Sequence, residues 1–84
     1  MTYEIDYLKA EHAGFSSILT VADRITVYVK LFSSGPARYF SGAQNGTIHK
    51  EITKVELDFW LNVLADNGDE ISEINKKIAL GKRY

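Results

Sequence analysis

The stretch Thr53-Lys54-Val55-Glu56-Leu57-Asp58-Phe59-Trp60 decides the fold, because it contains both a helix start and the beginning of an apolar helix face. Thr53 and Glu56 have the spacing of a capping box, in which each side chain accepts a hydrogen bond from the backbone amide of the other residue. Apolar residues then recur at i, i+3, i+4 and i+7, as Leu57, Trp60, Leu61 and Leu64. This period predicts an amphipathic helix that ends near Asp66 and packs its stripe on a core.

A second amphipathic helix is predicted after a turn at Asn67-Gly68, where glycine or asparagine supplies the left-handed residue that commonly closes a helix. We expect this helix to begin at Asp69. Its apolar stripe at i, i+3 and i+7 consists of Ile71, Ile74 and Ile78. Two helices joined by a short turn cannot bury both stripes against each other, so a sheet is expected beneath them.

The chain before Thr53 has the period of β-strands. We expect strands within 3–8, 15–21, 25–32 and 37–41, with 47–50 as a candidate short edge strand, a loop at 9–14 and turns at 22–24, 33–36 and 42–46. The strongest segment, 25–32, places Ile25, Val27, Val29 and Leu31 on one face, which we assign to the core. The sequence therefore predicts one α+β domain over 1–84, with an antiparallel sheet of three to four strands packed by two antiparallel C-terminal helices.

Composition narrows the classes of function. The 84 residues allow one small domain, and the lack of cysteine excludes disulfides and thiol chemistry, which favours a cytoplasmic protein. The formal net charge is −1 and no cluster of lysine and arginine appears in the sequence, so strong non-specific binding to nucleic acid is not expected. No segment has membrane-spanning length.

The residues capable of catalysis or metal binding show no recognised arrangement. The two histidines, His12 and His49, lack partners at metal-ligand spacing. None of the serines lies in a nucleophile elbow. We therefore expect no metal, no cofactor and no enzymatic activity.

Tyrosine is frequent in this chain, with five residues in a small domain. Tyrosine is favoured at protein interfaces because it combines a large contact area with a polar tip. Tyr3 and Tyr7 lie on the same face of one predicted strand and would form a patch on that face of the sheet. The simpler interpretation of each tyrosine is a half-buried strand residue.

Two segments resemble a known family. The first is Ile5-Asp6-Tyr7-Leu8 followed by His12, Phe15 and Ile18, and the second is the capped helix from Thr53 to Trp60. Together with the order of elements and a basic C-terminal tail, they are similar to the phage anti-CRISPR proteins that inhibit type I-F systems by binding the backbone subunits of the surveillance complex (Cascade). The resemblance extends over nearly the whole chain.

The resemblance implies a phage-encoded, non-enzymatic inhibitor that acts in the host cytoplasm and hinders hybridisation of target DNA. The family's inhibitory surface uses two tyrosines and a glutamate, whose positions correspond to Tyr7, Val21 and Lys30 here. We expect aromatic anchors surrounded by charged residues, and the expected partner-binding residues are Tyr7, Tyr3, Lys30, Arg38, Glu4 and Asp6.

The alternative is a small phage or bacterial interaction module that uses its sheet face to bind another host protein or single-stranded nucleic acid. Aromatic residues on a sheet can stack nucleobases, as well as contact proteins. The salt dependence of binding separates these two partners, because nucleic-acid affinity falls steeply as salt rises.

Overall fold

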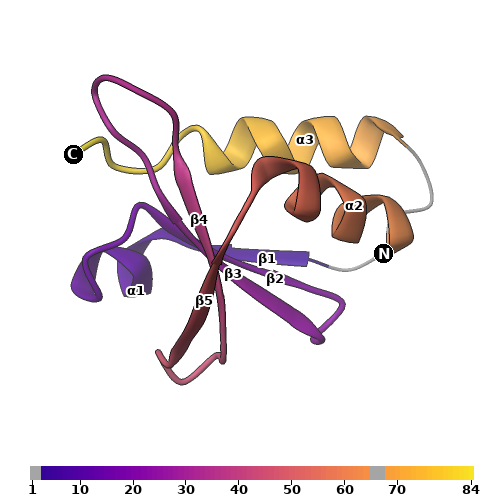
Figure 1. Ribbon diagram of the computed structural model, residues 1–84, viewed down its shortest axis with the longest axis horizontal. Coiled ribbons are helices and arrows are strands. Elements are labelled where there is room, and N and C mark those ends of the chain that lie inside the picture. The colour runs from indigo at the N-terminus through magenta and orange to yellow at the C-terminus, as the bar shows by residue number, and fades with distance from the viewer. Residues whose placement is uncertain (1–2, 65–67) are drawn as a thin grey trace.

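A computed structural model describes residues 3–64 and 68–84 and shows a twisted antiparallel sheet with the C-terminal helices packed on one side (Figure 1). The elements in chain order are β1 (Tyr3–Asp6), α1 (Tyr7–His12), β2 (Ser17–Val21), β3 (Ile25–Lys30), β4 (Arg38–Gly42), β5 (Ile48–Ile52), α2 (Lys54–Leu64) and α3 (Gly68–Ile78). The α+β class predicted from the sequence is confirmed. None of the described helices is long and apolar enough to cross a bilayer.

The sheet is a meander of five strands in the order β1-β2-β3-β4-β5, all antiparallel, which corrects the prediction of three to four. The last hairpin explains the difference, because β5 runs on to Ile52 and pairs with β4 from Tyr39 to Gly42. Its turn contains Asn45-Gly46, a dipeptide typical of hairpin turns. Ala43 N donates to Thr47 O at 2.8 Å, and Gly46 has a φ of 102°, a left-handed value that glycine adopts without strain.

The N-terminal segment differs from its prediction. The expected strand continued to Leu8 and the expected loop began at Lys9, whereas the structure ends β1 at Asp6 and begins α1 at Tyr7. The Asp6 side chain caps this helix by accepting a hydrogen bond from Lys9 N at 2.8 Å. A capping aspartate satisfies a free amide in the first turn, so it favours a helix start over continued strand.

The turn between β2 and β3 is as tight as predicted. Arg24 N donates to Val21 O at 3.0 Å. Ala22 and Asp23 have φ values of 53° and 55°, so two consecutive residues other than glycine adopt the left-handed conformation. Such a pair matches the right-handed twist of the flanking strands and keeps them in register.

The predicted helix start at Thr53 is confirmed, with one of the two hydrogen bonds of the capping box. Thr53 Oγ1 accepts from Glu56 N at 3.1 Å, while the Glu56 carboxylate lies 3.7 Å from the Lys50 ammonium. The predicted end near Asp66 and the turn residue Asn67 lie outside the described residues, and α3 begins one residue earlier than expected, at Gly68.

The main core lies between the sheet and the pair α2 and α3, which run in roughly opposite directions on the same side of the sheet (Figure 1). Both predicted helix stripes face this core, as does the predicted face of β3. Its buried members are Leu19, Val21, Val27, Val29, Leu31, Ile52, Leu57, Leu61, Ile74 and Ile78, with Trp60, Leu64, Ile71 and Ile25 packed at its margin.

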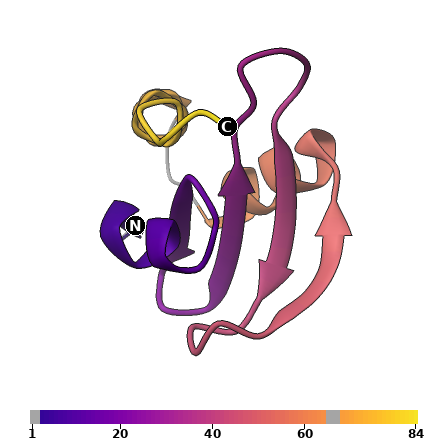
Figure 2. The same ribbon diagram turned by 90° about the vertical axis from the view of Figure 1, so that its left-hand side faces the viewer.

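A second, smaller cluster lies on the opposite face of the sheet. Ala10 of α1 packs there on Ile18 and Tyr28, with Phe15 and Phe40 around them. Figure 2 shows α1 in front of the first strands, whereas no helix lies in front of β4 and β5 on this side. One half of this face is therefore covered and the other half is open.

Candidate interaction surfaces

The first surface is a groove of about 410 Å³ between β1 and α3, which we call the tyrosine groove. Its lining consists of Tyr3, Ile5, Tyr7, Lys77 and Leu80. Leu80 is 78% exposed and Tyr7 is 37% exposed, so apolar surface is open to solvent at this edge of the molecule. The sequence predicted that Tyr3 and Tyr7 would form a patch, and both line this one groove.

Contacts with α3 hold the two tyrosines in place. The Tyr7 hydroxyl donates to the backbone carbonyl of Lys77. The Lys77 ammonium lies 5.2 Å from the centroid of the Tyr3 ring and 3.3 Å from the carboxylate of Glu73. A cation over an aromatic face is attracted by the ring quadrupole, so Lys77 positions the Tyr3 ring and also places a positive charge beside the groove.

The pKa shifts in the groove keep its groups in their usual protonation states. Burial raises the pKa of Tyr7, and the charge of Lys77 partly opposes that shift. A hydrogen bond with the Tyr3 side chain, followed by one with Glu73, raises the pKa of Lys77. At neutral pH the groove therefore presents the neutral phenol of Tyr7 next to the Lys77 ammonium.

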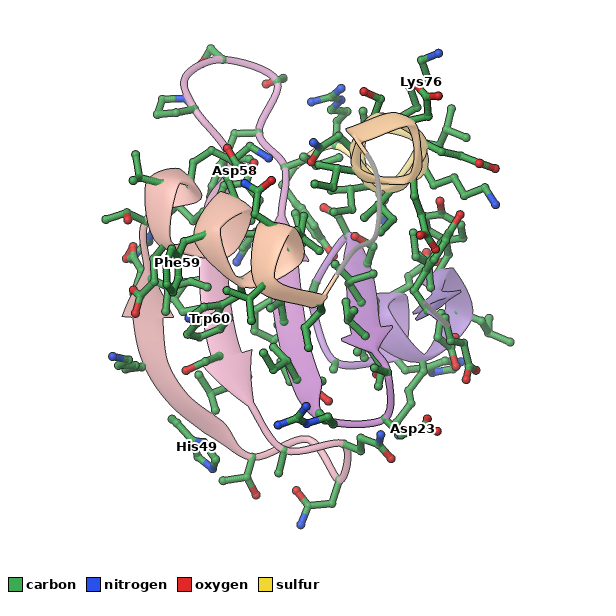
Figure 3. All side chains as sticks on the ribbon, turned by 90° about the vertical axis from the view of Figure 1, so that its right-hand side faces the viewer. Asp23, His49, Asp58, Phe59, Trp60 and Lys76 are labelled. Atoms are coloured by element: carbon green, nitrogen blue, oxygen red, sulfur yellow. The ribbon has the colours of Figure 1, made fainter. Side chains whose placement is uncertain are left out.

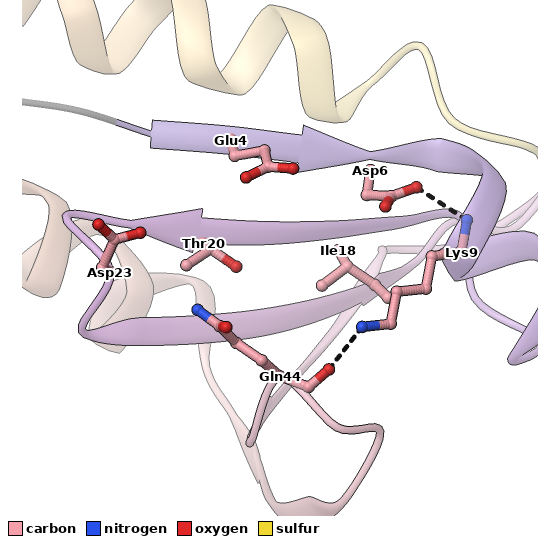
Figure 4. A pocket seen from close by; sticks show the side chains of 7 residues that line it. All are labelled: Glu4, Asp6, Lys9, Ile18, Thr20, Asp23 and Gln44. Carbon is pink, nitrogen blue, oxygen red and sulfur yellow. Dashed lines mark hydrogen bonds between the residues drawn. The ribbon is translucent and has the colours of Figure 1, made fainter.

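Glu4 and Asp6 lie on the opposite face of the sheet from the tyrosine groove, since neighbouring residues of β1 alternate in direction. They line a cavity of about 140 Å³ together with Asp23 and Lys9 (Figure 4). The Lys9 ammonium donates to the carbonyl of Gln44 at 2.7 Å, and both residues line the same cavity. No group of three ligating side chains within 3–64 and 68–84 is arranged to hold a metal ion.

Lys30 and Arg38 are directly opposite each other on β3 and β4 and share the open face. Arg38 forms a two-pronged contact with Glu51, with Nη2 to Oε1 at 2.7 Å and Nε to Oε2 at 3.1 Å. Hydrogen bonding between them raises the pKa of Arg38 and lowers the pKa of Glu51. Lys30 lies 5.2 Å from the ring centroid of Tyr84.

The six residues expected to bind a partner thus lie in three places rather than on one surface. Tyr3 and Tyr7 line the groove, Glu4 and Asp6 line the acidic cavity, and the two basic residues lie on the open sheet face. Val21, which corresponds to a contact residue of the resembling family, is 1% exposed beneath the helices. Because the chain enters α1 directly after Asp6, Tyr7 is a helix residue. Its side chain therefore does not continue the alternation of side chains along β1.

Aromatic residues around Lys30 were missed by the sequence analysis. Phe32 and Tyr84 both lie near its ammonium, and Phe40 lies under the guanidinium of Arg38 at 5.2 Å. The alternation of 25–32 already placed Phe32 with Lys30. By contrast, no local signal shows that Tyr84 returns to the end of β3, where its amide donates to Leu31 O at 3.0 Å.

An exposed apolar stripe on α2 was also missed. Val55, Phe59 and Val63 are 79%, 64% and 66% exposed at i, i+4 and i+8. Figure 3 shows Phe59 at the side of α2, while Trp60 lies beneath the helix toward the sheet. The helical position of Phe59, opposite Leu57 and Leu61, already indicates the outer face of α2.

Comparison of this chain with protein-family models, with curated proteins and with solved structures found no match.

Proposed function

We propose that this protein is a non-enzymatic anti-CRISPR inhibitor that binds the backbone subunits of a type I surveillance complex and hinders hybridisation of target DNA. The observation that carries the proposal is the tyrosine groove, in which Tyr3, Tyr7, Leu80 and the Lys77 ammonium are held together at one exposed edge. The family resemblance supplies the partner, and the groove supplies a surface on this chain that is suited to a protein partner.

The groove has the properties of a protein-binding anchor. Tyrosines dominate the energy of many interfaces because they bury much area and lose few rotamers. Here the Tyr7 hydroxyl bond and the Lys77 contact with Tyr3 fix both rings before a partner arrives. Such preorganisation reduces the entropy lost on association.

Inhibition would be steric. The protein measures 32 × 27 × 21 Å along its principal axes. A body of that length covers about nine nucleotides of a strand that rises about 3.4 Å per nucleotide. Bound to the backbone subunits beside the guide RNA, it would prevent target DNA from pairing over that length without any chemical step.

The test measures binding of the purified protein to a purified type I surveillance complex. Tyr7→Ala is expected to weaken binding by about 2 kcal/mol, or about 30-fold, if Tyr7 is an anchor. Phe59→Ala removes a more exposed aromatic ring from α2, on another part of the surface, and should leave the affinity unchanged. Equal effects of the two variants would exclude the groove as the contact surface.

Two controls separate binding from folding and from blocking. Tyr7→Phe removes only the hydrogen bond to Lys77 and should keep most of the affinity, while circular dichroism checks that both Tyr7 variants are folded. A gel shift with target DNA then tests the mechanism. If the complex captures this protein but binds its target DNA undiminished, hindered hybridisation is excluded.

A further inference from the structure

A continuous group of cations and aromatic rings covers the open face of the sheet. We call it the cation–aromatic patch and define it by Lys30, Phe32, Arg38, Phe40, Lys82 and Tyr84. The ammonium groups of Lys30 and Lys82 lie 5.2 Å and 5.8 Å from the centroid of the same Tyr84 ring. Residues from β3 and from the C-terminal end of the chain therefore meet in one place.

The patch continues across the next strand. Lys30 pairs in register with Arg38 of β4, whose guanidinium lies 5.2 Å from the Phe40 ring. Phe40 in turn makes an edge contact with Phe15, with 5.8 Å between ring centroids. Aromatic faces and positive charges thus alternate across two neighbouring strands.

Tyr84 is fixed by its own hydrogen bonds. Its amide donates to Leu31 O at 3.0 Å, its carbonyl accepts from Ser33 N at 2.8 Å, and its hydroxyl donates to Phe15 O at 2.9 Å. The ring is therefore held at the surface while remaining 38% exposed. A ligand that stacks on it needs to order little of the protein.

The charge of the patch is available to a ligand. Arg38 and Lys82 pair with Glu51 and Glu11 in exposed ion pairs of 2.7 Å and 3.3 Å, which are weak in water and exchange readily for another anion. Lys30 makes no ion pair with any residue in the described part of the chain, and its ammonium contacts only aromatic rings. The patch therefore has one uncompensated cation and two weakly compensated ones.

We propose that the cation–aromatic patch binds single-stranded nucleic acid. The phosphates of such a strand would pair with the charges of Lys30, Arg38 and Lys82. Its unpaired bases would stack on the rings of Tyr84 and Phe32. A duplex hides its base faces, and an acidic protein offers charge without planar bases, so neither uses both features of the patch. This surface lies on the other face of the sheet from the tyrosine groove, and the inference does not depend on the proposed function.

The test is fluorescence anisotropy of a labelled thymidine oligonucleotide of about 15 nucleotides, titrated with the full-length protein at several salt concentrations. Three phosphate contacts predict a slope of log affinity against log salt of about −2, at about −0.7 per contact for a single strand. Lys30→Gln should reduce that slope by about 0.7. Lys76→Gln neutralises an exposed lysine on the outer side of α3 (Figure 3) and should leave the slope unchanged.

A second variant tests stacking. Tyr84→Leu keeps an apolar side chain but removes the ring, and it should weaken binding about tenfold, whereas Tyr84→Phe should bind like the wild type. Thermal unfolding confirms that each variant is folded. Tyr7→Ala should not change oligonucleotide binding, which separates this surface from the groove.

Three results would overturn the proposal. The first is no binding of the oligonucleotide at low salt with protein up to about 1 mM. The second is equal weakening by Lys30→Gln and Lys76→Gln. The third is competition by double-stranded DNA or polyglutamate as effective as that by unlabelled oligonucleotide, because the patch would then recognise charge alone.

Discussion

The two faces of the sheet use the same strands in different ways. Along β3, Val27 and Val29 point to the helices and are completely buried in an aliphatic core. Tyr28 and Lys30, which alternate with them, point to the other face. Tyr28 is buried under α1, but Lys30 lies beyond that cover and remains half-buried.

The two faces therefore differ in what they contribute: one mainly stabilises the fold, and the other carries the cation–aromatic patch. Among the described residues, the face covered by α2 and α3 buries ten apolar side chains in one cluster, whereas the cluster on the opposite face has three. Because hydrophobic stabilisation scales with the apolar area removed from water, most of it comes from the first face. The open half of the second face is free to carry cations and aromatic rings that contribute little to folding.

The largest effect on stability is expected from a cavity in the core beneath α2 and α3. Leu19→Ala removes a side chain that is fully buried there, and we expect a loss of about 3 kcal/mol in unfolding free energy. Thr20→Ala, at the next position of β2, alters the other face and should change stability by about 0.5 kcal/mol or less. Urea unfolding followed by circular dichroism measures both, and equal losses would contradict the comparison.

The next effect comes from the close packing of the second face around Gly42. A Cβ at this position would lie 2.3 Å from Thr47 O and 2.9 Å from the Tyr28 ring. The ring thus occupies the space that a side chain on β4 would need, so Gly42→Ala should lose about 2 kcal/mol through strain. Gly46→Ser, in the adjacent turn, tests backbone strain instead of steric overlap. A Cβ at Gly46 would have no atom within 4 Å, but the residue has a positive φ. Urea unfolding of Gly42→Ala within error of the wild type would show that this face is loosely packed.

Much of the fold could be predicted from the sequence, because alternation and helical period are local signals. The core face of β3, the Thr53 cap and the stripe of α2 follow directly from them. The short helix α1 was missed because its only signal is the single capping residue Asp6, and six residues are too few for a clear period.

The candidate surfaces were less predictable than the fold. Tyr3 and Tyr7 do line one groove, but Tyr7 belongs to α1 rather than to the predicted strand, and their joint partner Lys77 lies 70 residues or more further along the chain. The cation–aromatic patch depends on Tyr84 returning beside Leu31, a contact between distant segments that only tertiary structure creates. Period and spacing report on neighbours in the chain and carry no information about such contacts.

A smaller effect is expected at Tyr28, whose hydroxyl donates to the carbonyl of Ala43 at 2.5 Å. Tyr28→Phe keeps the ring over Gly42 and removes only this bond, so we expect a loss of about 1 kcal/mol. Tyr39→Phe serves as a matched control. Tyr39 lies on the helix side of the neighbouring strand, and its hydroxyl makes no hydrogen bond among the described contacts. If both variants lower the thermal midpoint equally, the Tyr28 bond contributes nothing specific.

The smallest effect concerns the ion pair on the open half of the second face. Arg38 lowers the pKa of Glu51 below its ordinary value of 4.5, chiefly through a hydrogen bond. Because the folded-state pKa is depressed, the pair's contribution is present above that ordinary value and is lost as pH falls through the folded-state pKa. Both groups are exposed, so the change in stability should be slight.

Carboxyl titration by NMR measures this effect directly. The Glu51 pKa should lie below 4.5 in the wild type and return toward 4.5 in Arg38→Gln. Lys50→Gln is the matched control, because it removes a cation from the same strand that pairs with Glu56 and not with Glu51. A wild-type Glu51 pKa at or above 4.5 would mean that Arg38 and Glu51 do not form a persistent pair in solution. In that case the guanidinium stays over Phe40 without a competing carboxylate, and the open face carries two uncompensated cations instead of one.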